Sequence, residues 1–322
     1  MSRHGCRIAA AALGLALFAC AATGARAGPP RGDPEAVMVD ELVVTSHTGG
    51  PAWWRVSSPT ATVYVLGIPG ALPKGLKWDQ TLLKRRLDGA TVLVARPIVT
   101  AGLGDVFALL KIRQHLRSRG AMEDSLPAPL RARFLADRGR LTSDRRAYSG
   151  WTPLVAGLLM VSDFRKQGRL DGTQPGAAIE GLARDKGVKV VPAGAYKAVP
   201  LFRAAEMGLT EAGPACLADA LDEIEAGADR ERAAAEGWAH GDVAAALSAQ
   251  RGYEKCLNAL PEGADLASKA MADTTAAIVA ALARPGHAVA VVNLRTLLAQ
   301  DGVLQRLKAQ GYRISTPREA GA

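Results

Sequence analysis

The sequence predicts a mixed α/β fold, in which a central sheet is flanked by helices. Short runs of β-branched and aliphatic residues, such as 62–66 and 288–292, are typical of strands that are buried on both faces. Longer stretches rich in Ala, Leu, Glu and Arg lie between these runs and favour helices. This alternation is the pattern of a sheet with helices packed around it.

Turn-forming residues separate the expected elements. Ser58 and Pro59 lie between the first two strands and predict a hairpin, and Pro285-Gly286 leads into a late buried strand. The sequence predicts strands at 53–56, 62–66, 91–96, 188–191, 288–292 and 312–314. It predicts helices at 78–87, 102–120, 127–138, 152–167, 175–186, 215–259 with breaks at Gly237 and Gly241, 264–283, and 297–310. We expect the last strand, helix and strand to form a parallel crossover unit, and the helices within about 102–171 to form an insertion.

The start of the chain has the pattern of a secretory signal peptide. Arg3 and Arg7 precede an apolar run at 8–22, and Ala25-Arg26-Ala27 forms a small-residue cleavage site. We therefore expect export to the bacterial periplasm or cell envelope. The predicted organisation is a signal peptide at 1–27, a flexible tether at 28–51, one domain at 52–316 and a tail at 317–322.

A second interpretation of the first segment stays open. Leu17-Phe18-Ala19-Cys20 is similar to a bacterial lipobox, in which the cysteine carries lipid. Lipid on Cys20 would tether the chain to a membrane, and without it we expect no membrane anchor, because no later segment is long and apolar enough to span a bilayer. Soluble export and lipid anchoring are both retained as hypotheses.

Removal of residues 1–27 leaves two of the four cysteines, Cys216 and Cys256. An exported chain meets an oxidising compartment, where an even pair of cysteines favours a disulfide. Two separate buried thiols are the alternative. Neither cysteine has a neighbouring His or basic residue that would indicate an activated nucleophile.

Basic residues are concentrated in one part of the chain. Between 111 and 146 there are ten Lys or Arg residues and four Asp or Glu residues. A solvated helical face explains this excess, and contact with an anionic lipid or polysaccharide is the alternative. Nucleic acid is not an expected partner, because no aromatic residues alternate with these charges to stack on bases.

The positions where an open α/β sheet places its chemistry carry few reactive groups. Ligands and substrates bind beyond the carboxyl ends of such strands. Here the loops Gly67-Ile68-Pro69-Gly70 and Asn293-Leu294-Arg295 contain no His, Cys, Asp or Glu. No two histidines have the spacing of metal ligands, and we interpret Asp242 as a helix cap. The sequence therefore predicts no catalytic residue, no metal and no cofactor.

Several motifs in order resemble the TraB/GumN family, which includes the Tiki-type metalloproteases. At the front these are Ala52-Trp53-Trp54-Arg55-Val56, the run 62–67 that ends in Gly67, and Leu72-Pro73 followed by Trp78. Trp238-Ala239-His240-Gly241-Asp242 is similar to the family's W-x-x-G-D, and 301–312 is similar to its closing helix and strand. The resemblance covers nearly the whole chain after residue 52 and implies an α/β fold built around a metallohydrolase site.

The chain departs from the family's proposed active site. The resemblance places the histidines of two G-x-x-H motifs at Gly70 and Arg295, and two glutamates near Ala95 and at Gly194. An Arg-Asn pair falls at Ala270-Met271, where neither residue type is present. Divalent metal catalysis needs several His or carboxylate ligands, and the fixed positive charge of Arg295 would repel a cation.

The resulting expectation is a pseudoenzyme of the cell envelope that binds a peptide, a glycan or a protein partner in the inherited cleft. Arg96 and Arg295 would form an anion receptor if they face each other there. Two other functions are retained. One is a metal-dependent hydrolase or peptidase whose site is relocated or completed by a partner, and the other is a structural envelope lipoprotein.

Overall fold

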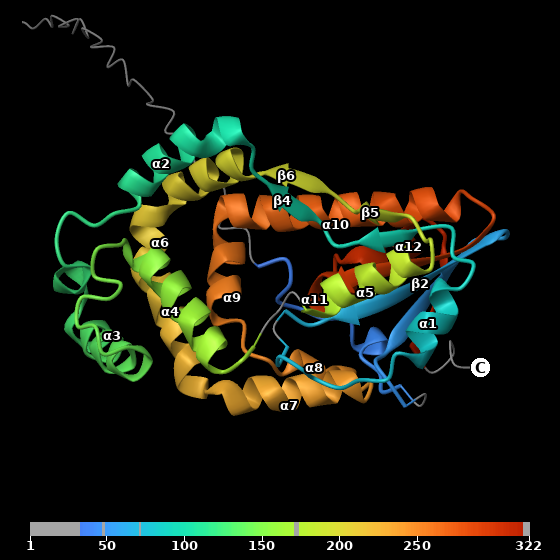
Figure 1. Ribbon diagram of the computed structural model, residues 1–322, viewed down its shortest axis with the longest axis horizontal. Coiled ribbons are helices and arrows are strands. Elements are labelled where there is room, and N and C mark those ends of the chain that lie inside the picture. The colour runs from blue at the N-terminus through green and yellow to red at the C-terminus, as the bar shows by residue number, and fades with distance from the viewer. Residues whose placement is uncertain (1–32, 47–48, 71, 171–173, 318–322) are drawn as a thin grey trace, which may run out of the picture.

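The computed structural model describes residues 33–46, 49–70, 72–170 and 174–317 (Figure 1). The predicted signal peptide with Cys20, the first residues of the predicted tether, and the tail from 318 onward lie outside the described residues. The described chain is a mixed α/β fold, which confirms the predicted fold class. None of the described helices combines the length and the apolar character that a membrane span requires.

A six-stranded mixed sheet with the order β5-β3-β7-β2-β1-β8 forms the centre of the molecule. Its strands are β1 (Trp53–Ser57), β2 (Ala61–Ile68), β3 (Leu93–Ala95), β5 (Val190–Pro192), β7 (Gly286–Asn293) and β8 (Arg313–Ser315). Four neighbours, β5, β3, β7 and β2, are mutually parallel, whereas β1 is antiparallel to β2 and to β8. The predicted hairpin is thus confirmed, and β8 runs parallel to β7 as the predicted crossover requires. A second, two-stranded sheet pairs β4 (Ile98–Thr100) with β6 (Ala195–Lys197).

Helices make up most of the remaining described chain. They are α1 (Thr81–Leu87), α2 (Val106–His115), α3 (Ala128–Leu141), α4 (Pro153–Gln167), α5 (Gln174–Asp185), α6 (Ala198–Ala226), α7 (Ala228–Ala239), α8 (Val243–Leu247), α9 (Gly252–Ala259), α10 (Pro261–Leu282), α11 (Leu294–Leu298) and α12 (Val303–Ala309). Short 3-10 turns lie at Asp40–Leu42, Leu103–Asp105 and Met122–Ser125.

Two hydrophobic clusters hold these elements together. The larger one surrounds the sheet and includes buried side chains from α1, α5, α7, α10, α11 and α12. The smaller one lies among α3, α4, α6 and α9, away from the sheet in Figure 1. A disulfide between Cys216 of α6 and Cys256 of α9 joins two walls of this smaller cluster, with the two Cα atoms 5.2 Å apart. The predicted disulfide is therefore confirmed.

Two helical segments differ from the predicted ones. The helix expected from 215 begins at Ala198 and ends before Gly227, whose φ of 83° lies in the left-handed region that favours glycine. The helix expected at 297–310 is divided into α11 and α12. Gly302 separates them, and a Cβ atom there would lie 2.6 Å from the carbonyl oxygen of Thr296, so this close approach of the backbone requires glycine.

The predicted flexible tether is wrong for the described residues 33–46 and 49–51. Leu42 is buried in the larger cluster, and β-bridges join Met38 to Ala299 and Thr45 to Asp242. The amide of Val39 also donates to the carbonyl of Leu298 at 3.0 Å. Leu42 is joined in this contact by Met38, Val39 and Val43, which pack against the same cluster, so side-chain packing and backbone pairing together hold the segment on the domain.

Replacing both Cys216 and Cys256 by Ser is expected to lower the free energy of unfolding by about 3–4 kcal/mol. The 40-residue separation gives the unfolded chain a long loop that the disulfide constrains. Urea denaturation of the oxidised chain and of the double variant measures the difference. A loss of less than 1 kcal/mol would show that the smaller cluster holds α6 and α9 together without the covalent bond.

Candidate functional site

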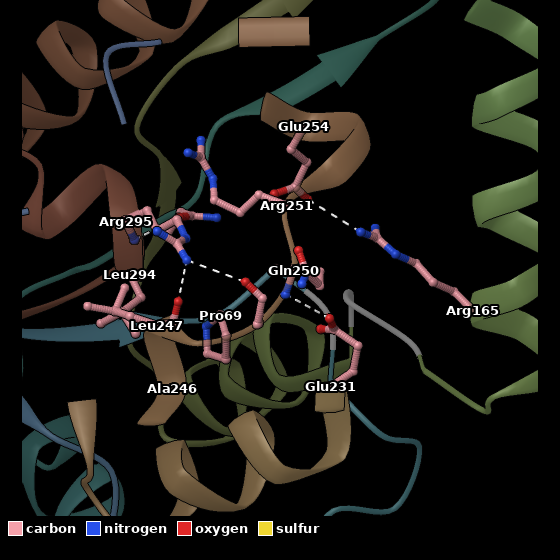
Figure 2. Close-up of a pocket in the computed structure, with 13 residues that line it drawn as sticks. Pro69, Arg165, Glu231, Ala246, Leu247, Gln250, Arg251, Glu254, Leu294 and Arg295 are labelled. Carbon is pink, nitrogen blue, oxygen red and sulfur yellow. Dashed lines mark hydrogen bonds and ion pairs between the residues drawn. The ribbon is translucent and has the colours of Figure 1, made fainter. Parts of the chain in front are cut away.

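A polar pocket lies at the carboxyl edge of the parallel strands. Strand β2 leads into Pro69 and Gly70, and the register of β2 and β7 places Ile68 beside Asn293, so both loops reach the same point. The pocket is small, with about 30 Å³ of space for water-sized molecules. It is lined by Pro69, Gly70, Arg165, Glu231, Ala246, Leu247, Ala249, Gln250, Arg251, Glu254, Asn293, Leu294 and Arg295, most of which Figure 2 labels.

The β7 side of the pocket is fixed by hydrogen bonds to the backbone. The side-chain oxygen of Asn293 accepts from the amides of Arg295 at 3.0 Å and Thr296 at 3.4 Å, which caps α11. The guanidinium of Arg295 donates to the carbonyl oxygens of Leu247 and Ala249 (Figure 2). Burial lowers the pKa of Arg295 from its ordinary value. Both side chains are thus engaged in joining β7 and α11 to the end of α8.

Two carboxylates reach the pocket from helices. Glu231 of α7 is 4% exposed and accepts from the amide of Gln250 at 2.9 Å. Burial raises the pKa of Glu231 above the ordinary glutamate value. Glu254 of α9 lies beside Gly70, where a Cβ atom would be 3.1 Å from its Oε1 atom. The space that a side chain at residue 70 would enter is therefore bordered by a carboxylate.

Arg165 of α4 connects this pocket to the smaller cluster. Its guanidinium lies 2.8 Å from Glu223 and 3.9 Å from Glu254, and Figure 2 shows it directed at Glu254 across the pocket. The side chain of Glu223 is fully buried, which raises its pKa even though Arg165 favours the charged form. Arg165 thus neutralises a carboxylate that would otherwise be costly to bury.

Arg251 connects the pocket to the N-terminal segment. Its guanidinium lies 2.6 Å from Asp33 and 3.1 Å from Glu35. The Glu35 carboxylate also accepts from the hydroxyl of Thr296 at 2.5 Å and from the side-chain amide of Asn258 at 3.3 Å. Burial raises the pKa of Glu35. The residues that were expected to be a tether therefore form part of the pocket's supporting structure.

The structure brings only some of the predicted site residues together. Gly70, Asn293 and Arg295 line the same pocket. Gly67 lies behind it, where its carbonyl accepts from the Trp238 indole at 2.7 Å. Ala95 does end a strand at the same edge of the sheet, but it lines a different pocket on the β5 side.

Gly194 does not share neighbours with Gly70. A Cβ atom on Gly194 would lie 2.9 Å from the hydroxyl of Tyr196, which donates to Asp273 at 2.7 Å. A larger side chain at 194 would therefore displace Tyr196 from Asp273.

Arg96 and Arg295 do not line one pocket. Arg96 borders a pocket with Glu180 and Thr274 and packs against Gly176 of α5, where a Cβ atom would lie 2.8 Å from its guanidinium. Arg295 belongs to the polar pocket beside Gly70 described above, which we call the Gly70 pocket, and its guanidinium donates to carbonyl oxygens. Arg96 and Arg295 therefore do not face one ligand, as the predicted anion receptor would require.

Sequence reasoning missed the charged residues that reach the pocket from helices. Arg165, Glu231, Arg251 and Glu254 lie on or beside helices whose charges have the spacing of ordinary solvated faces, so the sequence contains no signal that distinguishes them. The interpretation of Asp242 as a helix cap is confirmed, since its side chain accepts from the amide of Ala245 at 2.9 Å. Among the residues that the structure describes, no three His, Cys, Asp or Glu side chains are grouped so as to hold a metal ion.

Fold and pocket together define a mixed α/β protein with a charged cleft at the carboxyl edge of its parallel strands. The chain belongs to the TraB/PrgY/gumN family, whose pattern it matches over residues 52–316. This confirms the resemblance and its extent. No curated protein and no solved structure matches the chain.

Glu231→Gln is expected to raise the free energy of unfolding at pH 7 by about 1 kcal/mol, the scale of the cost of a buried polar group. A carboxyl whose pKa is raised by folding binds its proton more tightly in the folded state. Its contribution to stability is therefore largest below the ordinary value of 4.5 and is lost as the pH rises above it. The glutamine keeps an oxygen that accepts from the amide of Gln250.

Urea denaturation at pH 4, 5.5 and 7 measures this effect, with Glu236→Gln at an exposed position of the same helix as the control. The gain from Glu231→Gln should shrink toward pH 4, whereas the control should show little change at any pH. A gain of equal size at all three values would rule out desolvation of a charged Glu231 as its cause.

Proposed function

We propose that this chain is a non-catalytic member of the TraB/PrgY/gumN family, exported to the bacterial cell envelope, that binds a peptide, glycan or protein partner at the Gly70 pocket. The proposal rests on the residues that occupy positions 70 and 295, where the resemblance implies histidines. Gly70 offers no side chain, and the guanidinium of Arg295 is engaged by the carbonyl oxygens of Leu247 and Ala249.

The residues at this edge do not fit a divalent metal ion. Asn293, which lies at the end of β7, uses its side-chain oxygen to cap α11. Arg295 brings a permanent positive charge to the pocket, and Arg165 and Arg251 add two more. A cation would meet three guanidinium groups and two carboxylates, Glu231 and Glu254, instead of a shell of neutral imidazoles and carboxylates.

The pocket does have the properties of a small polar binding site. Guanidinium and carboxylate groups of opposite sign line it, and its space for water-sized molecules, about 30 Å³, suits a small polar group such as the end of a chain rather than a large ligand. Its walls come from elements fixed by the disulfide, by helix caps and by ion pairs. Such a preorganised pocket loses little conformational entropy when a ligand binds.

Export is supported by two independent features. The segment 1–27 has the composition of a signal peptide, and the two cysteines that remain after its removal are joined to each other. Disulfides form and persist outside the cytoplasm. The envelope is also where peptides and glycans are available to a binding protein.

A hydrolase whose site is completed by a partner is the second candidate. The observation that favours it is that Glu231 and Glu254 border the same pocket, so two of the oxygen donors that a hydrolytic site requires are present. Both carboxylates are already engaged, by the amide of Gln250 and by the guanidinium of Arg165 respectively. This is why we favour binding over catalysis.

The purified chain is expected to bind less than 0.1 equivalent of manganese, cobalt or zinc after dialysis and to cleave no peptide in their presence. Elemental analysis and assays with fluorogenic peptides measure the two quantities, and Glu231→Gln with Glu254→Gln serves as the reference for background hydrolysis. One equivalent of metal together with turnover that the double variant loses would contradict the proposal and favour the second candidate.

Gly70→Leu is expected to weaken the binding of a pocket ligand at least tenfold, because the new side chain enters the space beside Glu254. Short peptides and envelope glycan fragments are screened by thermal shift, and calorimetry then measures affinity. Gly181→Leu is the matched control, since the space around Gly181 on α5 is open. Equal affinity of the chain and both variants for a ligand found in the screen would place its site elsewhere.

A further inference from the structure

Helix α2 and strand β4 expose apolar side chains that no described element covers. Phe107 is 84% exposed and Val99 is 62% exposed, and Ile98, Val106 and Leu110 are each more than two-fifths exposed. These five residues, which we call the α2–β4 patch, include most of the large hydrophobic side chains that are exposed in the described part of the chain. Their gathering in one stretch of 13 residues calls for a physical explanation.

The patch is not the core-facing side of α2. Ile112 is buried and is located on the opposite side of the helix from Val106 and Leu110, which are one helical turn apart. α2 packs against α6 and lies at the periphery of the molecule (Figure 1). A helix that is apolar on both sides is normally covered on both sides. The outward side of α2 is therefore suited to an external apolar phase.

Positive charge accompanies the patch. Residues 106–119 contain Lys111, Arg113, Arg117 and Arg119 and neither Asp nor Glu. Among the described residues, none of these four forms an ion pair, and the guanidinium groups of Arg113 and Arg117 lie 5.7 and 4.7 Å from the centre of the Trp151 ring. Lys111 and Arg113 are located on the two flanks of the exposed helix face, one residue after Leu110 and three residues after it.

We propose that the exposed face of α2 docks on the surface of an anionic lipid bilayer, with Phe107, Val106 and Leu110 inserted at the level of the headgroups. Interfacial helices combine Phe and Leu on one face with Lys and Arg on its borders, because the apolar groups enter the acyl boundary while the cations remain at the phosphates. The charge complementarity and the outward projection of Phe107 select this occupant. The residues of α2 form none of the pockets described above.

This proposal is independent of the Gly70 pocket, which lies at the carboxyl edge of the sheet. It would give the chain a membrane contact whether or not Cys20 carries lipid. The test therefore uses residues 28–322, which contain every residue that the structure describes and lack both Cys20 and the apolar segment 8–22.

Co-sedimentation with vesicles tests the proposal. Vesicles of equal parts phosphatidylglycerol and phosphatidylcholine should bind the chain, and vesicles of phosphatidylcholine alone should bind it at least tenfold more weakly. Phe107→Ser with Leu110→Ser should reduce binding about tenfold or more, and Lys111→Gln with Arg113→Gln should reduce it about fivefold for each charge removed. Leu135→Ser with Leu158→Ser, at exposed apolar positions of α3 and α4, is the matched control and should bind as the parent does.

A second measurement locates the contact. In residues 28–322 the only two cysteines form the disulfide, so Phe107→Cys provides a single thiol for an environment-sensitive dye. Its emission should shift to shorter wavelength on addition of anionic vesicles, and a dye on Leu158→Cys should not respond. Circular dichroism establishes that each variant is folded.

The proposal is overturned if the parent does not bind anionic vesicles, or if the patch variant and the control variant lose binding equally. It is also overturned if analytical ultracentrifugation shows a dimer that Phe107→Ser with Leu110→Ser abolishes while no vesicle binding is found. That result would assign the patch to a second copy of this chain.

Discussion

The arrangement of this protein depends on the parallel pairing of β2 with β7. Eight residues of each strand are in register, from Ala61 beside Gly286 to Ile68 beside Asn293, although more than two hundred residues separate them in the chain. Parallel strands end at the same edge of a sheet, so this pairing places the Gly70 loop and the start of α11 next to each other. Both strands are largely buried, and a shift of one residue would turn every side chain to the other face of the sheet and disrupt its packing.

The pocket that results is formed by charges that mostly have partners within the protein. Arg251 is held by Asp33 and Glu35, Arg165 by Glu223, and Arg295 by carbonyl oxygens. Pairing is necessary because an isolated charge at such depth would be expensive to desolvate. It also means that each guanidinium has a fixed position, so the pocket presents a fixed pattern of charge to whatever enters it.

Much of the fold could be predicted from the sequence, because its signals are local. The Val-rich runs ending at Leu66 and Val292 predicted buried strands, and the two cysteines that follow the predicted signal peptide predicted their own pairing. The pocket could be predicted only in part. Gly70 and Arg295 follow strand ends and were expected there, whereas Glu254 reaches the pocket only because α9 packs beside Gly70. The N-terminal segment was misjudged for the same reason, since Arg251, the partner of Asp33, lies more than two hundred residues further along the chain.

Under the proposed function, the same scaffold would keep the pocket after the loss of catalytic residues. The shape of the cleft comes from the β2–β7 register, from the cap that Asn293 provides and from the ion pairs around Arg165 and Arg251, and none of these requires a metal ion. A histidine side chain at residue 70 would have to share its space with Glu254, so glycine there opens the pocket. Arg295 supplies a bond between α11 and the end of α8 at the opposite wall. The two departures that the resemblance implies, at residues 70 and 295, would thus act together: Gly70 leaves space, and Arg295 fixes the wall that encloses it.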